Sequence, residues 1–401
     1  MKNITPPKNI TLPRYVRQVL VVLEARGYGV YIVGGNVRDL LLNIQPNQWD
    51  ICTSASVKEI LSLFHGARLY DEALGIVAVP IGKNVVFVDS INDDKKSEEL
   101  VIDAVSSMGN LTDELSSRDF TMDAMALTPS GVIYDPFDGR IDMARKTIRC
   151  VGDPLENFAA EPVRMFRAFF FAAKLGFGID EQTHEAIEKN AALAAGIRPE
   201  RVRNAIEKLL LSPRPELLGE VIRCGLMKRY LKTSELDEMQ FMRLASLPKK
   251  SLYRWAGLCC ILRQAGAIDS ADAFLSSLKL DNRTIRCAQD CCTLIERPAP
   301  EDPVAWKKLL RSWGIDTVDC MAACRDAICG GSRRRELKAI LKSGECFTMR
   351  HLALNGDDLT ALGYKGRMLG DMLNFLLDYV IEYPENNRRE VLLSLVSAVE
   401  E

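Results

Sequence analysis

The chain has 401 residues, a formal net charge of −2 and 47% hydrophobic residues. This length exceeds what one ordinary hydrophobic core accommodates, and it predicts two to four domains. Because the net charge is close to zero, any binding to nucleic acid would depend on local patches of Lys and Arg, not on the overall charge.

The absence of targeting patterns and the spacing of the cysteines indicate the expected cellular compartment. The opening segment, MKNITPPKNITLPRY, has no apolar run of signal-peptide length, and no later window approaches the ~20 apolar residues of a membrane span. There are twelve cysteines but no CxxC pair, and two groups fall at helical spacing inside apolar runs, namely Cys287, Cys291, Cys292 and Cys320, Cys324, Cys329. We expect buried core thiols rather than a zinc site, in a reduced, cytoplasmic protein without membrane contact.

Short strands and helices alternate in the first part of the chain. Segments bounded by Gly, Asn or Pro are predicted as strands, at 27–35, 49–54, 75–82, 84–91 and 131–136. Between them, residues 37–43 and 56–64 carry helical spacing. These patterns predict an α/β unit of about 150 residues.

Strand patterns stop after the segment IRCVGDP, and amphipathic helical patterns continue to the end. Proline-containing segments interrupt them at 211–218, 297–303 and 382–387, and proline favours a helix or domain boundary. We therefore predict four parts, with boundaries at 1–150, 151–212, 213–300 and 301–401.

A glycine pair follows the first predicted strand. Gly34 and Gly35 precede the helical segment NVRDLLL, so the backbone could approach a phosphate while the helix presents its N-terminal amides. A plain strand-to-helix turn would need the same residues, because short glycine motifs have low specificity. Arg38 and Asp39, one turn into that helix, would pair with a nucleotide or with each other.

Residues two apart in a strand project from one face, as two carboxylates must if they are to hold two magnesium ions for phosphoryl transfer. Here the pair is Gln48 and Asp50, and only Asp50 is acidic. A glutamine carbonyl can bind a hard cation but adds no charge, so we expect weaker Mg²⁺ binding and weaker activation of an attacking hydroxyl. Taken alone, Asp50 would equally suit a surface carboxylate at a strand end.

Two further segments carry charge inside apolar surroundings. In SRDFTMDAMAL, the pair Arg118 and Asp119 leads into a predicted helix. In EPVRMFRAFFFAAKLGF, Glu161 and Arg164 stand at i and i+3 of a predicted helical face, and Arg167 stands one turn further on. A carboxylate and a guanidinium could read the edge of cytosine or adenine, although an intrahelical salt bridge of little energy would have the same spacing.

These segments together, with WDICTSA and IYDPFDGRIDMARKTIRCVGDP in the same order, resemble the bacterial CCA-adding enzyme and poly(A) polymerase family of nucleotidyltransferases. The resemblance covers residues 28–210. Residues 354–393 look like the C-terminal segment of the CCA-adding branch, which favours that branch.

The resemblance implies a fold and an activity. The fold would be an α/β head with a polymerase-β-type nucleotidyltransferase mixed sheet, followed by an all-α neck, body and tail that bind tRNA or a tRNA-like RNA. The activity would be transfer of CMP and AMP from CTP and ATP to the tRNA 3′ end, with Mg²⁺ as cofactor. No pattern predicts an oligomeric state.

The resemblance also assigns residues. Asp50 would be catalytic and a metal ligand, Gln48 and Asp89 would be the other metal positions, and the nucleotide would contact Gly34, Gly35, Arg38, Arg118, Asp119, Glu161, Arg164 and Arg167. At several positions the sequence departs from the family pattern, and each departure removes a charge or changes the length of a side chain. These positions are Gln48, Phe87, Ser117, Ala160-Glu161 and Phe170. Two hypotheses follow: an active enzyme with a weakened metal site in which Asp89 substitutes, or a non-catalytic relative that binds RNA or nucleotide.

RNA contacts are expected from basic residues of the helical part, at Arg198, Arg201, Arg203, Lys249, Lys250, Arg333, Arg334 and Arg335. For the last three, a solvated helix start would explain the same pattern. A third hypothesis, an attached metal-dependent phosphohydrolase, is disfavoured because none of His65, His184 and His351 is followed by Asp.

Overall fold

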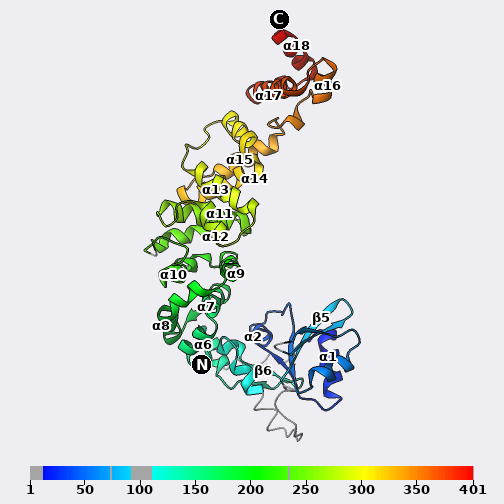
Figure 1. Cartoon of the computed structure of the whole chain (residues 1–401), viewed down its shortest axis with the longest axis vertical. Coiled ribbons are helices and arrows are strands. Elements are labelled where there is room, and N and C mark those ends of the chain that lie inside the picture. The colour runs from blue at the N-terminus through cyan, green and yellow to red at the C-terminus, as the bar shows by residue number, and fades with distance from the viewer. Residues whose placement is uncertain (1–11, 73–74, 92–110, 234, 401) are drawn as a thin grey trace. The chain divides into compact units, whose positions relative to one another are not determined.

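The computed structural model describes residues 12–72, 75–91, 111–233 and 235–400 (Figure 1). The chain divides into two compact units, Met1–Ala194 and Ala195–Glu401. In the described part of the chain, none of the helices combines the length and apolar character that a bilayer crossing requires.

The first unit contains a mixed sheet with the strand order β3-β4-β5-β2-β1-β6-β7. The strands are β1 (Val30–Val33), β2 (Asp50–Thr53), β3 (Arg68–Asp71), β4 (Ile76–Ile81), β5 (Asn84–Ser90), β6 (Ala126–Leu127) and β7 (Ile133–Tyr134). β2 and β5 run parallel, and the other neighbours run antiparallel. The mixed sheet is confirmed, and the five predicted strands correspond to β1, β2, β4, β5 and β7, whereas β3 and β6 were not predicted.

Helices flank this sheet: α1 (Arg14–Glu24), α2 (Gly35–Leu41), α3 (Val57–Leu63), a helical segment at 111–116 and α5 (Gly139–Arg145). α1 buries Val16, Val19, Leu20 and Leu23, which lie on one face at helical spacing. α3 begins at a capping box, because Ser56 and Glu59 satisfy each other's backbone amides. The predicted helices at 37–43 and 56–64 correspond to α2 and α3.

The helix predicted within residues 117–127 is wrong. Phe120 forms an isolated bridge to Cys150, a 3-10 turn η1 (Thr121–Asp123) follows, and the segment ends in β6. Every residue from Phe120 to Leu127 except Asp123 is buried, and such continuous burial suits a segment threaded through the core better than an amphipathic helix. Thr121 anchors it by donating a hydrogen bond to Asp142 at 2.6 Å.

Helices complete the first unit: α6 (Pro154–Ala160), α7 (Val163–Leu175), α8 (Glu181–Asn190) and the 3-10 helix η2 (Ala191–Gly196), which crosses the boundary between the units. Glu161 was predicted to share a helical face with Arg164, and this is wrong. It is instead the C-cap residue of α6, with φ −142° and ψ 83°. Pro162 explains this, because the residue before a proline is disfavoured from helical geometry. Two-residue strands β8 (Thr147–Ile148) and β9 (Gly178–Ile179) pair in parallel.

The described residues of the second unit are helical, as predicted. The α-helices are α9 (Pro199–Leu210), α10 (Leu218–Arg223), α11 (Ser251–Gln264), α12 (Ala271–Ser277), α13 (Asn282–Ile295), α14 (Pro303–Cys329), α15 (Arg333–Ser343), α16 (Gly356–Ala361), α17 (Gly366–Glu382) and α18 (Arg389–Glu400). The 3-10 helices are η3 (Pro215–Leu217), η4 (Glu238–Ser246), η5 (Met349–His351) and η6 (Pro384–Asn386). The predicted interruptions fall between α9 and α10, α13 and α14, and α17 and α18.

Helices α11, α13 and α14 pack together and share a core that contains most of the chain's thiols. All twelve cysteines are free and eleven are buried, so the prediction of buried thiols is confirmed. α14 is broken at Gly314, where φ is 76° and ψ is 163°. A separate apolar cluster joins α16, α17 and α18 through residues that include Leu359, Leu376 and Leu392.

Candidate active site

The glycine pair lies at the turn from β1 into α2. Gly34 has a φ of +70°, which side-chain-bearing residues rarely adopt, and a Cβ on it would lie 3.3 Å from Arg118 Nη1. A Cβ on Gly35 would lie 3.0 Å from Arg38 Nη2. The two glycines therefore leave room for two guanidinium groups against the backbone of this turn.

Arg38 is only 4% exposed and is fully engaged within the protein. Its Nη1 contacts Asp123 Oδ1 at 2.5 Å, its Nη2 contacts Asp39 Oδ1 at 2.8 Å, and its guanidinium lies 4.9 Å from the centre of the Phe171 ring. Burial raises the pKa of Asp123, and the charge of Arg38 opposes this shift. Arg38 thus pairs with Asp39, one of the two predicted alternatives, and ties α2 to the η1 segment; its contact with a nucleotide stays a prediction.

Arg118 lies on the other side of the turn, close to the acidic residues of the sheet. Its Nη2 contacts Glu114 Oε1 at 2.5 Å, within a helical i,i+4 pair. Its positive charge also opposes the rise in the pKa of Asp50 and of Asp89. Arg118 is therefore close enough to both carboxyl groups to affect their charge. Glu114 was not among the predicted site residues, although its position four residues before Arg118 favours such a pair.

Asp50 and Asp89 occupy adjacent parallel strands. In the register of β2 and β5, Asp50 is opposite Phe87, and Asp89 is opposite Cys52. Burial raises the pKa of Asp50, whereas hydrogen bonds from Gln48 and Asn36 lower it. Burial and the charges of Glu114 and Asp50 raise the pKa of Asp89 to about 7.

Gln48 is exposed and precedes β2 rather than lying within it. Its amide nevertheless reaches the Asp50 carboxyl, as the alternation argument requires. Phe87 fills the position opposite Asp50 and packs edge-on against Tyr70, with ring centroids 4.8 Å apart. An aromatic ring therefore stands where a third carboxylate would complete the acidic group.

The donor set suits one hard cation better than two. Mg²⁺ prefers oxygen ligands, and Asp50, Asp89 and the Gln48 carbonyl supply them. Burial first, and then the charges of Glu114 and Asp50, raise the pKa of Asp89, and a bound divalent cation would favour its ionised form. Ligand atoms of Cys52, Asp89 and Glu114 lie within 4.8 Å of one another, but Glu114 is held by Arg118 and burial raises the pKa of the Cys52 thiol.

The two arginines predicted to read a base share one carboxylate. Arg164 Nε lies 2.7 Å from Asp119 Oδ1, and Arg167 Nη1 lies 2.5 Å from Asp119 Oδ2. Arg164 also donates to the Ser117 carbonyl at 2.9 Å and to the Asn157 side chain. Asp119 therefore orients both arginines.

The arginine pair differs in exposure, since the side chain of Arg164 is 19% exposed and that of Arg167 is 46% exposed. Glu161 is half-buried and its carbonyl accepts from the Arg164 amide at 3.0 Å, so the two residues adjoin although they do not share a helix. Phe170 lies beside Phe171, with ring centroids 5.3 Å apart. The sequence did not indicate the role of Asn157.

The predicted RNA-binding residues of the second unit fall into two kinds. Exposed cations are Arg198, Lys249, Lys250 and Arg335. The others are half-buried: Arg203 donates to the Lys279 carbonyl at 2.6 Å, Arg333 pairs with Glu336, and Arg334 binds both oxygens of Asp319. Arg201 is half-buried as well.

Comparison with known proteins identifies the family. Family models match as follows: the poly A polymerase head domain at residues 30–149, the RNA and SrmB binding site of polymerase A at 176–237, and tRNA nucleotidyltransferase domain 2 at 248–396. The CCA-adding enzyme of Geobacillus sp. (strain WCH70) is 32% identical over 385 residues, which is 93% of each chain. The chain belongs to the CCA-adding enzyme family.

Other members of the CCA-adding enzyme family align over nearly the whole chain. The enzyme of Enterococcus faecalis is 30% identical and covers 96% of this chain and 97% of its own. The crystal structure of the Bacillus stearothermophilus CCA-adding enzyme in complex with CTP has a TM-score of 0.78 and 29% identity, covering 97% of this chain and 98% of that one. The Thermotoga maritima CCA-adding enzyme complexed with tRNA shares the fold, with a TM-score of 0.71 at 19% identity over 97% of this chain and 96% of that one.

Proposed function

We propose that this chain is a tRNA nucleotidyltransferase that transfers CMP and AMP from CTP and ATP to the tRNA 3′ end, at a rate limited by Gln48. The observation that carries the proposal is the grouping of Asp50, Asp89 and Arg118 at the glycine turn after β1. Such a turn accepts phosphate, and the carboxylates lie on adjacent strands of the sheet, two register positions apart.

Each residue then has a role. Gly34 and Gly35 admit the triphosphate, Arg118 offsets its charge, and Asp50 accepts the proton of the attacking hydroxyl. Mg²⁺ would be held by Asp50 and Asp89 with help from the Gln48 carbonyl, and when bound it would neutralise phosphate charge and acidify the hydroxyl.

Base selection is assigned to the segment that joins α6 and α7. Glu161 would accept from the exocyclic amine of cytosine or adenine, and Arg164 and Arg167 would donate to ring nitrogen or carbonyl oxygen. Asp119 and Asn157 would hold the arginines in place before the nucleotide arrives. Uracil and guanine present the opposite pattern of donors and acceptors to such a set.

A second candidate function is binding of tRNA or nucleotide without efficient transfer. The neutral amide of Gln48 and the ring of Phe87 favour it, because both stand where carboxylates would hold metal. The glycine turn and the two arginines of the α7 helix do not depend on those carboxylates. Binding would therefore survive a loss of chemistry.

Incorporation of labelled CTP and ATP into tRNA lacking its 3′ end separates the two candidates. With purified protein and Mg²⁺ or Mn²⁺, we expect slow addition of C and then A, dependent on Asp50. Nucleotide or tRNA binding without incorporation would establish the non-catalytic candidate instead. If neither binding nor incorporation occurs, both candidates are wrong.

The division of labour follows the predicted four parts: residues 1–150 for catalysis, 151–212 for nucleotide and RNA contact, and 213–300 and 301–401 for holding tRNA. Matches of the family models to the head, the RNA-binding region and tRNA nucleotidyltransferase domain 2 support this division. Twelve free thiols support the inferred cytoplasmic location, because thiols stay reduced there.

Arg335 and Arg334 offer a matched test of RNA binding. Arg335→Ala should weaken tRNA binding and reduce the slope of log affinity against log salt by about one, because one phosphate contact is lost. Arg334→Ala should instead lower the unfolding temperature, since its guanidinium binds Asp319 and lies 5.2 Å from the centre of the Tyr253 ring. Filter binding across a salt series and thermal unfolding measure the two effects. Unchanged affinity and slope in Arg335→Ala would remove this residue from the RNA surface.

A further inference from the structure

Three thiols from two helices converge in the second unit. Cys287 and Cys291 stand one turn apart on α13, and Cys320 lies on α14. Their Sγ atoms all lie within 4.8 Å of one another, and all three residues are buried. Neither the substrate nor the RNA contacts proposed above use them.

Further thiols extend this group. The Cys320 thiol also has a hydrogen-bond contact with Cys324, one turn further along α14. The Cys291 thiol donates weakly to the Thr317 carbonyl at 3.7 Å. Thiolates are the form of cysteine that binds metal.

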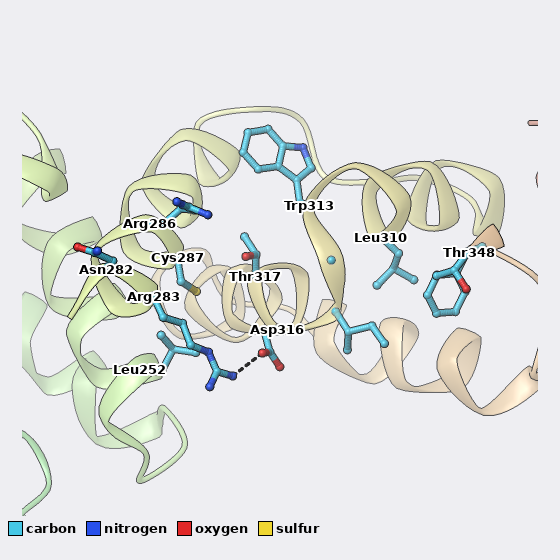
Figure 2. Close-up of a pocket in the computed structure, with 13 residues that line it drawn as sticks. Leu252, Asn282, Arg283, Arg286, Cys287, Leu310, Trp313, Asp316, Thr317 and Thr348 are labelled. Atoms are coloured by element: carbon cyan, nitrogen blue, oxygen red, sulfur yellow. Dashed lines mark hydrogen bonds and ion pairs between the residues drawn. The ribbon is translucent and has the colours of Figure 1, made fainter. Parts of the chain in front are cut away.

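A cavity of about 750 Å³ reaches the trio at Cys287 (Figure 2). Its wall includes Thr317 and the break in α14 at Gly314. Two other lining residues, Arg283 and Asp316, form an ion pair at 2.5 Å. Figure 2 shows the Cys287 sulfur between α13 and Thr317. Cys287 is therefore the member of the trio that the cavity reaches.

We propose that Cys287, Cys291 and Cys320 form a binding site for a soft, thiophilic metal ion. Tetrahedral coordination with metal–sulfur bonds of 2.3 Å places sulfur atoms ~3.8 Å apart, so the observed separations need to shorten by at most ~1 Å. Sulfur ligands select soft cations such as Cu(I) and Zn(II) over hard ones such as Mg²⁺.

The surroundings favour Cu(I) over Zn(II). Three thiolates suffice for Cu(I), whereas Zn(II) is almost always four-coordinate, and the ligand group among the described residues has three members. Zn(II) would take its fourth ligand from water in the cavity. Arg286 lines the cavity beside Cys287, so one cation lies near the thiolates.

Metal loading of the full-length, reduced protein tests the proposal without nucleotide or tRNA. After Cu(I) or Zn(II) is added in the presence of a competing chelator, we expect one ion per chain by elemental analysis. X-ray absorption at the metal edge should show three sulfur ligands, and a thiolate-to-metal absorption band should appear. Binding should also raise the unfolding temperature, because the ion joins α13 to α14.

Variants locate the site. Cys291→Ser and Cys320→Ser should each lose the bound ion at the same chelator concentration. Cys346→Ser is the matched control, since this residue is equally buried but belongs to the apolar cluster of α16, α17 and α18, and it should retain the ion. If the unmodified protein retains no ion, or holds it through fewer than three sulfurs, the proposal is wrong. Because that readout uses the unmodified chain, misfolding of a variant cannot rescue the proposal.

Discussion

Gln48→Asp is expected to raise the rate of C and A addition by about two orders of magnitude. The new carboxylate would lie beside Asp50, where the Gln48 amide already reaches, and would add the negative charge that a second cation requires. Each ~1.4 kcal/mol of transition-state stabilisation is worth tenfold in rate, so this gain needs only ~3 kcal/mol. Single-turnover incorporation of labelled CTP, over a Mg²⁺ titration, measures both the rate and the metal requirement.

Gln45→Asp is the matched control for this change. Gln45 is exposed three residues earlier, so the same substitution adds the same charge away from Asp50 and should leave the rate unchanged. Asp89→Asn should lower activity in both the unmodified and the Gln48→Asp background. Full activity of the unmodified protein, with Gln48→Asp neutral and Asp89→Asn harmless, would show that the metals bind elsewhere.

Arg164→Ala should weaken CTP and ATP together and reduce discrimination against UTP. The Arg164 guanidinium is held at Asp119, Ser117 and Asn157, so it is oriented before a base arrives. Losing one partner of a desolvated charged contact typically costs ~2–5 kcal/mol, which corresponds to at least ~30-fold in affinity. Nucleotide affinities from equilibrium binding, compared for CTP, ATP and UTP, measure this effect without requiring catalysis.

Arg167→Ala tests the second arginine of the proposed base-reading set. Arg167 contacts the same Asp119 carboxylate but is more exposed, so its removal should cost less affinity while disturbing Asp119 in the same way. Equal losses of affinity in the two variants would contradict this ranking of the two arginines. Equal affinities of the unmodified protein for CTP, ATP and UTP would end the base-reading proposal.

The sequence predicted elements whose patterns are local. Strands β1, β2, β4 and β5 carry continuous apolar runs bounded by turn residues, and α3 carries its own capping box. The helix predicted across Phe120 to Leu127 was wrong, because the apolar residues of this segment are buried on all sides and not on one helical face. Pro162 shifted Glu161 out of the expected helix, and the rule that governs residues before proline could have shown this in advance.

Partners from distant segments were beyond sequence reasoning. Asp123 contacts Arg38 from 85 residues away, and Asp119 contacts Arg167 from 48 residues away. From the sequence, Cys287 and Cys291 were interpreted as core thiols, because two helical thiols four residues apart need a third ligand from another helix to hold a metal. Only the packing of α13 against α14 supplies Cys320.

The break in α14 at Gly314 separates two sets of partners. Before it, Lys308 contacts Glu382 at 2.7 Å and Arg311 contacts Asn374 at 2.8 Å, both on α17; after it, Asp319 binds Arg334 of α15. The backbone angles at Gly314 belong to a region that is essentially restricted to glycine. One residue without a side chain therefore joins the half of α14 that contacts α17 to the half that contacts α15, and a side chain at this position would strain the backbone between them.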